Sequence, residues 1–247
     1  MNVSVAFLPA LVEDIAQKVV VAIDVLRATT TLVVMCHQGG ERVVLAETTA
    51  DGRSLRRRLG PEYLLCGEEN GLPPAGFDHG NSPVEFSTLD LTGRQLILCT
   101  SNGTRTLLQV AQAPVALVGS LVNGWAVLTR AVTEAQARGL DLTLVCSGHK
   151  YASSFGIDDA YCAGFLVGQL IAMGVKGLKP EESALAALRL CSSYADDTLA
   201  AFKEAANGRH LISIGLTEDL RFCAQRDVSQ MVPRLYREGD LLVVRKE

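Results

Sequence analysis

Residues Val19–Asp24, with the sequence VVVAID, decide the fold class of this 247-residue chain. Apolar residues run without interruption up to a single acidic one, as expected of a central strand that is buried on both faces of a sheet. Similar runs recur along the chain, at Val43–Ala46, Tyr63–Cys66, Gln95–Cys99, Val115–Val118 and Leu142–Cys146. Two shorter runs near the ends, Val3–Phe7 and Leu241–Val244, are further candidate strands.

Helical segments are expected between these strands. They are Thr49–Leu59, Thr104–Ala111, Val122–Arg138 and Asp158–Met173. Strands that alternate with helices predict an α/β fold with a largely parallel sheet. From about residue 178 to residue 235 the chain reads as mainly helical, and no linker rich in Pro, Gly or Ser separates this part. We therefore expect residues 1–247 to form a single domain.

Composition excludes several classes of protein. The 23 Lys and Arg against 27 Asp and Glu give a net charge of −4, so the chain lacks the basic excess that binds nucleic acid. The seven cysteines form no C-x-x-C pair and suit a reducing cytoplasm. The longest weakly polar stretch, Cys162–Val175, has 14 residues and is too short to span a membrane.

Polar residues gather directly after the predicted strands. The segments concerned are Asp24–Thr31, Cys66–Gly71, Cys99–Thr104, Gly119–Asn123 and Cys146–Gly148. In open α/β sheets ligands bind outside the carboxyl ends of the strands. If the sheet is parallel, these five loops face one side, and we expect the functional site there.

Thr100–Thr104 (TSNGT) is the best candidate for binding an anion. Gly103 lets the backbone approach a ligand, and the hydroxyl groups of Thr100, Ser101 and Thr104 add donors at the start of a helix. The alternative is an ordinary strand-to-helix turn with a Ser or Asn cap.

Asp24 follows a buried strand, where a carboxylate is costly unless a metal or a donor satisfies it. A salt bridge with Arg27 is one alternative to a metal. Asp158 and Asp159 also supply carboxylates, and the alternative for one of them is a helix N-cap. Oxygen ligands of this kind suit Mg²⁺. Cys146 reads as a buried thiol rather than a nucleophile, and the four histidines, none of which forms a ligand pair, read as surface residues.

Four blocks of sequence carry a resemblance to a known family. They are Ile23–Thr31; Gly67-Glu68 with Gly76–Pro83; Thr100–Thr104; and Cys146–Gly148 with Asp158-Asp159 and Cys162–Gly164. In this order and spacing they resemble the 2-phosphosulfolactate phosphatase (ComB) family, over about residues 19–165. Two departures keep the type of chemistry: Ser101 stands where members often have Thr, and Asp158 where they often have Glu.

The resemblance implies a three-layer α/β/α fold with a mixed, largely parallel central sheet. It also implies a Mg²⁺-dependent phosphatase that converts 2-phospho-3-sulfolactate, or a similar small phospho-acid, to 3-sulfolactate and phosphate, on the route to coenzyme M. The partner would be a small anionic phosphate ester. The sequence leaves open whether the chain forms a homo-oligomer.

Clustering and resemblance together assign expected roles to individual residues. The expected metal ligands are Asp24, Glu68 and Asp159, and the expected catalytic carboxylates are Asp24, Asp158 and Asp159. The expected substrate-binding residues are Arg27, Thr29, Thr30, Asn81, Ser82, Thr100, Ser101, Asn102, Gly103 and Thr104. Among these, Arg27 would bind the carboxylate or sulfonate.

Two alternatives belong to other functional classes. A binding protein would hold a phosphorylated metabolite without releasing phosphate. A phosphotransferase would move the phosphoryl group to an acceptor other than water.

Overall fold

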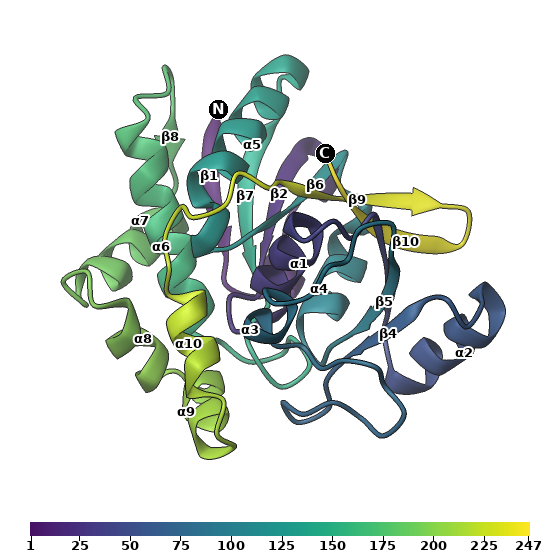
Figure 1. The fold of residues 1–247 in the computed structure, drawn as a ribbon. Coiled ribbons are helices and arrows are strands. Elements are labelled where there is room, and N and C mark those ends of the chain that lie inside the picture. The colour runs from purple at the N-terminus through teal and green to yellow at the C-terminus, as the bar shows by residue number, and fades with distance from the viewer.

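Ten strands form one continuous sheet in the computed structural model, which describes residues 1–247 (Figure 1). They are β1 (Asn2–Ala6), β2 (Lys18–Ile23), β3 (Arg42–Ala46), β4 (Leu64–Gly67), β5 (Gln95–Cys99), β6 (Val115–Gly119), β7 (Asp141–Cys146), β8 (Lys179–Pro180), β9 (Pro233–Glu238) and β10 (Leu241–Lys246). Their order across the sheet is β4-β5-β3-β10-β9-β6-β2-β7-β1-β8. All the strands predicted from apolar runs are present.

The sheet consists of two parallel blocks joined by a hairpin. β4, β5 and β3 form one block, and β6, β2, β7, β1 and β8 form the other. The hairpin β9–β10 joins them, with β10 antiparallel to β3 and β9 antiparallel to β6. The sheet is therefore mixed and largely parallel, which confirms the predicted fold class.

Helices cover both faces of the sheet and make three layers. They are α1 (Ala28–His37), α2 (Thr49–Leu59), α3 (Pro83–Phe86), α4 (Gly103–Gln109), α5 (Gly124–Arg138), α6 (Ile157–Ala172), α7 (Glu182–Ser192), α8 (Thr198–Glu204), α9 (Ala206–Ser213) and α10 (Thr217–Cys223). Helices α1, α3 and α4 pack on one face, and α2 and α5 to α10 on the other. Figure 1 shows α1 and α4 between the block that contains β2 and the block that contains β5.

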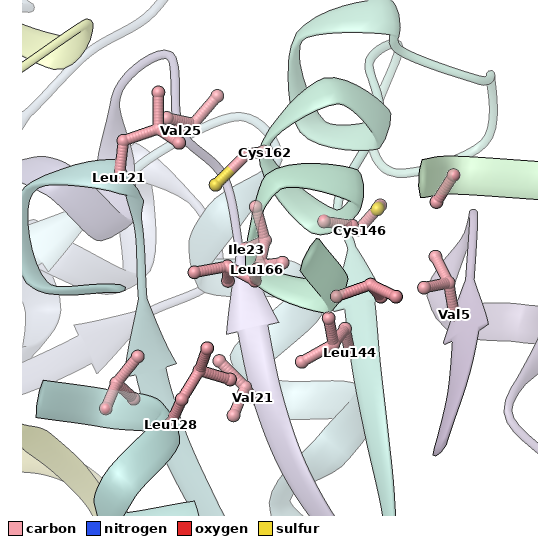
Figure 2. Packing of buried hydrophobic residues seen from close by; sticks show 14 of the residues in the cluster. Val5, Val21, Ile23, Val25, Leu121, Leu128, Leu144, Cys146, Cys162 and Leu166 are labelled. Atoms are coloured by element: carbon pink, nitrogen blue, oxygen red, sulfur yellow. The ribbon is translucent and has the colours of Figure 1, made fainter. Parts of the chain in front are cut away.

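Strand β2 shows how the sheet is buried on both faces. Val21 and Ile23 belong to a core cluster with α5 and α6, and Figure 2 shows Ile23 beside Leu166 of α6. The alternate residues Val20 and Ala22 belong to the cluster under α1 and α4. The apolar run is continuous because both sets of side chains are buried.

The chain from 182 to 223 folds as four helices on the outside of α6. Helix α7 packs closely on α6 because Gly164 has no side chain: a Cβ there would lie 2.0 Å from the carbonyl oxygen of Ala187. None of the helices combines the length and the apolar composition needed to cross a bilayer.

Candidate functional site

A polar cavity of about 270 Å³ lies where the loops after β2, β4 and β5 meet, and α9 supplies another wall. It is lined by Asp24, Leu26, Arg27, Glu68, Asn70, Gly71, Asn81, Thr100, Ser101, Asn102, Asn207, His210 and Leu211. Three of the five predicted strand-end loops thus share one cavity. The loop after β6 does not reach it, because the Asn123 side chain accepts from the Ser120 N–H and donates to the Met231 carbonyl.

Asp24 directly follows β2, lines this cavity and is 4% exposed. One of its oxygens, Oδ1, accepts from the Ala28 N–H at 3.3 Å, at the start of α1. Burial, followed by the negative charge of Asp158, raises the pKa of Asp24 to about 7. No salt bridge forms between Asp24 and Arg27, so that alternative is wrong.

Asp158 and Asp159 lie in the first turn of α6, whose N-cap is Gly156, so neither is the expected N-cap. Both oxygens of Asp159 accept backbone N–H groups, from Val25 and Gly148, each at 2.8 Å. Asp158 Oδ2 accepts from Asn207 Nδ2 at 3.1 Å, whereas its Oδ1 is buried without a partner. Burial raises the pKa of both carboxyl groups.

Glu68 ties two loops together at the cavity wall. Its Oε1 accepts from the Ser101 N–H at 2.7 Å, and its Oε2 accepts from the Gly71 N–H at 2.8 Å. The structure gathers no three His, Cys, Asp or Glu side chains into a ready-made metal site. The expected ligand set of Asp24, Glu68 and Asp159 is therefore not preassembled, and it remains a prediction.

Of the predicted site carboxylates, Asp24 and Asp158 are the two that keep an oxygen free of donors, and of these only Asp24 lines the cavity. Asp24 lines the cavity with only the Ala28 N–H donating to it, and Asp158 has an oxygen without any donor. Each of these carboxylates is buried, and their charges repel each other. Mg²⁺ is usually held by one or two carboxylates together with water and substrate phosphate, so this pair suits it.

The Thr100–Thr104 turn lies directly against Asp24. A Cβ on Gly103 would lie 2.7 Å from Asp24 Oδ2 and 2.4 Å from the Ala28 Cβ, so only glycine allows this approach. The hydroxyl of Thr100 accepts from the Thr104 N–H at 3.0 Å, and the hydroxyl of Thr104 donates to the Thr100 carbonyl. These two hydroxyl groups hold the shape of the turn.

Ser101 and Asn102 line the cavity from the same turn. Asn102 is the N-cap residue of α4, as the alternative interpretation expected, but its side chain makes no capping hydrogen bond. Its oxygen instead accepts from the Ala152 N–H at 3.2 Å, in the loop after β7.

Thr29 and Thr30 lie in the first turn of α1, although the sequence analysis placed them in a loop. Their hydroxyl groups donate to the Asp24 and Val25 carbonyl oxygens, and neither residue lines the cavity. The structure thus gives them a part in holding the β2–α1 turn that carries Asp24. Their assignment to substrate binding remains a prediction.

Arg27 forms a buried ion pair with Asp219. Its Nη1 donates to Asp219 Oδ2 at 2.6 Å, and its Nη2 donates to the Gly71 carbonyl at 2.7 Å. Ser82 donates to the other oxygen of Asp219 at 2.6 Å. Asn81, which is 4% exposed, lines the cavity and its Oδ1 has no partner.

Three residues that the sequence did not predict complete the site. Asn207 and His210 line the cavity from α9, and Asp219 reaches Arg27 from α10. His210 is exposed, as the sequence predicted, and its Nε2 lies 3.0 Å from the carbonyl of Asn70, which also lines the cavity. No local pattern marks these residues, because only the packing of α9 and α10 brings them to the strand ends.

Comparisons with known proteins give one family and several named relatives that match this chain. The sequence profile of a family described as 2-phosphosulpholactate phosphatase matches residues 7–238. A protein of Deinococcus radiodurans named "Probable 2-phosphosulfolactate phosphatase" is 35% identical over 224 residues, which cover 90% of each chain. Proteins with the same name from Gloeobacter violaceus and Carboxydothermus hydrogenoformans are 33% and 30% identical, over 98% and 99% of this chain and 98% and 97% of theirs.

Proposed function

Because this chain belongs to the 2-phosphosulpholactate phosphatase family, we propose that it hydrolyses 2-phospho-3-sulfolactate to 3-sulfolactate and phosphate. One observation carries the proposal: Gly103 brings the Ser101–Gly103 backbone against the carboxylate of Asp24 in the cavity. A phosphoryl group held by that turn would lie beside the carboxylates. Phosphate esters react slowly unaided, so positioning and charge stabilisation must supply most of the catalysis.

The charges of the cavity support a cation-dependent reaction. Asp24 and Glu68 line it, and Arg27, its one permanently charged basic residue, is already paired with Asp219. A substrate with phosphate, carboxylate and sulfonate groups would meet carboxylates without a compensating charge. We therefore propose that Mg²⁺ is the cofactor, held by Asp24 and Asp158.

The bound ion would neutralise phosphoryl oxygens and lower the pKa of a water. The residues of the chain would bind and orient the ester around it. The N–H of Gly103, which has no acceptor within α4, would donate to a phosphoryl oxygen. Asn81, Ser101 and Asn102 would supply further polar contacts from the cavity wall. Asn207 would keep Asp158 turned so that its free oxygen is available.

Phosphate release tests the proposal. The purified protein, stripped with EDTA, is assayed with 2-phospho-3-sulfolactate and a panel of small phospho-acids, with and without added Mg²⁺. We expect release that requires Mg²⁺ and is fastest with 2-phospho-3-sulfolactate, and Asp24→Ala is the inactive control. Full activity after exhaustive chelation contradicts the role of the metal.

Two other results would favour the alternative classes. Ligand binding without phosphate release from any ester supports a binding protein. Transfer of phosphate to an added acceptor in preference to water supports a phosphotransferase.

We also propose a cytoplasmic location, because none of the seven cysteines forms a disulfide and six of them are buried. Free thiols persist in reducing compartments. Fractionation of cells that produce the protein tests this, and recovery outside the cytoplasm contradicts it.

A further inference from the structure

Asp219 is the buried partner of the one arginine in the cavity. It lies on α10, 192 residues away from Arg27 in sequence. The two side chains are 2% and 3% exposed, and Arg27 Nη1 lies 2.6 Å from Asp219 Oδ2. A short, charge-assisted bond between two groups that exclude water fixes the direction of the guanidinium.

Both oxygens of Asp219 are in use. Oδ2 accepts from Arg27, and Oδ1 accepts from the hydroxyl of Ser82 at 2.6 Å. Ser82 ends the long loop that carries Asn81 into the cavity. One carboxylate therefore holds two parts of the cavity wall, the β2–α1 turn and the loop before α3.

Arg27 also contacts a third part of the cavity wall, the loop after β4. Its Nη2 donates to the Gly71 carbonyl at 2.7 Å, and the N–H of Gly71 donates to Glu68. A guanidinium has five N–H groups, so donors remain after these two bonds, and Arg27 lines the cavity. Their direction depends on the bond to Asp219.

We propose that Asp219 is a positioning residue: by fixing Arg27 and Ser82 it sets the shape of the cavity wall formed by the β2–α1 turn and the loop before α3. This part of the wall would bind the anion. The inference rests on the proposed function, because that function supplies the anionic ligand. Asp219 touches no substrate atom itself. Its loss leaves Arg27 without its acceptor and frees the Asn81-Ser82 wall from α10, so the bound ester is held less firmly.

The test compares Asp219→Ala with the isosteric Asp219→Asn. Each variant is characterised by kcat and KM with 2-phospho-3-sulfolactate, by the Kd for inorganic phosphate from calorimetry at fixed Mg²⁺, and by its melting temperature. For Asp219→Ala we expect KM and Kd to rise about tenfold or more, the effect of losing a hydrogen bond to a charged group, with kcat changed less. Asp219→Asn keeps an oxygen for Arg27, so both values should stay within about threefold of wild type.

Two further variants keep the test decisive. Glu218→Gln changes the neighbouring exposed residue, which pairs with Arg221, and should leave KM and Kd unchanged. Ser82→Ala leaves the Arg27–Asp219 pair in place and removes the second link, together with the hydrogen bond that the Ser82 hydroxyl accepts from the Glu85 N–H at the start of α3. It should raise KM about threefold without loss of folding, and it serves if Asp219→Ala does not fold.

The inference is overturned if folded Asp219→Ala, or Ser82→Ala in its place, binds phosphate and substrate like wild type, since the residue would then only stabilise the fold. It is also overturned if Asp219→Asn loses as much affinity as Asp219→Ala, since charge rather than position would then matter. If wild type releases phosphate from no ester, the proposed function fails, while the phosphate Kd values still test the role of Asp219.

Discussion

Asp158 and Asp159 are adjacent in sequence, yet their carboxylates have different surroundings. Both oxygens of Asp159 accept backbone N–H groups, which join the turn after β2 to the turn after β7. Asp158 has one oxygen bonded to Asn207 and one with no partner. Asp159 therefore holds two turns together, and under the proposed function Asp158 is the carboxylate with an oxygen free for a cation.

Matched alanine substitutions should separate the two roles. We expect Asp158→Ala to lower kcat/KM by about 100-fold or more, because it removes a proposed ligand of the cation, and to change stability little. Asp159→Ala leaves two buried N–H groups without acceptors, at a cost of about 1–3 kcal/mol each. Urea unfolding and phosphate release measure the two effects. Unchanged stability of Asp159→Ala together with full activity of Asp158→Ala would reverse the assignment.

Asp24 should make the metal-free protein less stable as the pH rises. Its pKa is raised from 3.8 to about 7 in the folded protein, so between these values the folded state binds more protons than the unfolded state. Protonation of Asp24 therefore stabilises the folded protein fully below about pH 4. This contribution to the free energy of unfolding is lost as the pH rises through about 7. Asn in its place carries no charge at any pH.

Asp24→Asn in EDTA should therefore be more stable than wild type above pH 7, and this gain should shrink toward pH 4. The size of this gain in stability follows from the pKa shift of Asp24, at about 1.4 kcal/mol for each pKa unit. The gain is therefore a few kcal/mol at most. Urea unfolding at intervals from pH 4 to pH 8.5 measures it, and added Mg²⁺ should stabilise wild type but not the variant. A gain that is constant over this range contradicts the raised pKa.

Apolar runs predicted the strands well because a strand buried on both faces needs apolar residues at every position. Strand β9 was missed since its sequence, PRLYRE, begins with a proline and contains three charged residues, and β8 was missed since it has only two residues. Helix α1 was missed entirely, because Thr29–Thr31 read as a polar loop, whereas their hydroxyl groups donate to carbonyl oxygens.

The site could be predicted only as far as the strand ends define it. Asp24, Glu68 and Thr100–Asn102 follow their strands directly, so the topology brings them to one cavity. Asn207, His210 and Asp219 arrive through the packing of α9 and α10 on α6 and α3, and no periodicity in the sequence encodes that packing. Roles within a pair such as Asp158-Asp159 depend on hydrogen bonds, which spacing alone does not specify.

Gly103 should be among the glycines least tolerant of substitution. The Cβ of Gly103→Ala would lie 2.4 Å from the Ala28 Cβ and 2.7 Å from Asp24 Oδ2, so the turn must move away from the carboxylate. We expect activity to fall by about 100-fold or more, because displacement by about 1 Å can cost that much. Gly168→Ala in α6 is the control, since its Cβ meets only Leu188 at 3.4 Å. Similar activity of the two variants contradicts the close approach.

Cys146 ends β7 near the site, and its substitution tests whether the enzyme uses a cysteine nucleophile. The thiol is 1% exposed, and burial raises its pKa well above the usual value, so the reactive thiolate is disfavoured at neutral pH. Cys146→Ala should therefore retain phosphate release within about twofold, while the small cavity lowers stability by about 1 kcal/mol. Steady-state kinetics and thermal unfolding measure the two effects. Loss of activity in a folded Cys146→Ala protein would point to a phosphocysteine intermediate, and the carboxylate-centred site would then need to be reassigned.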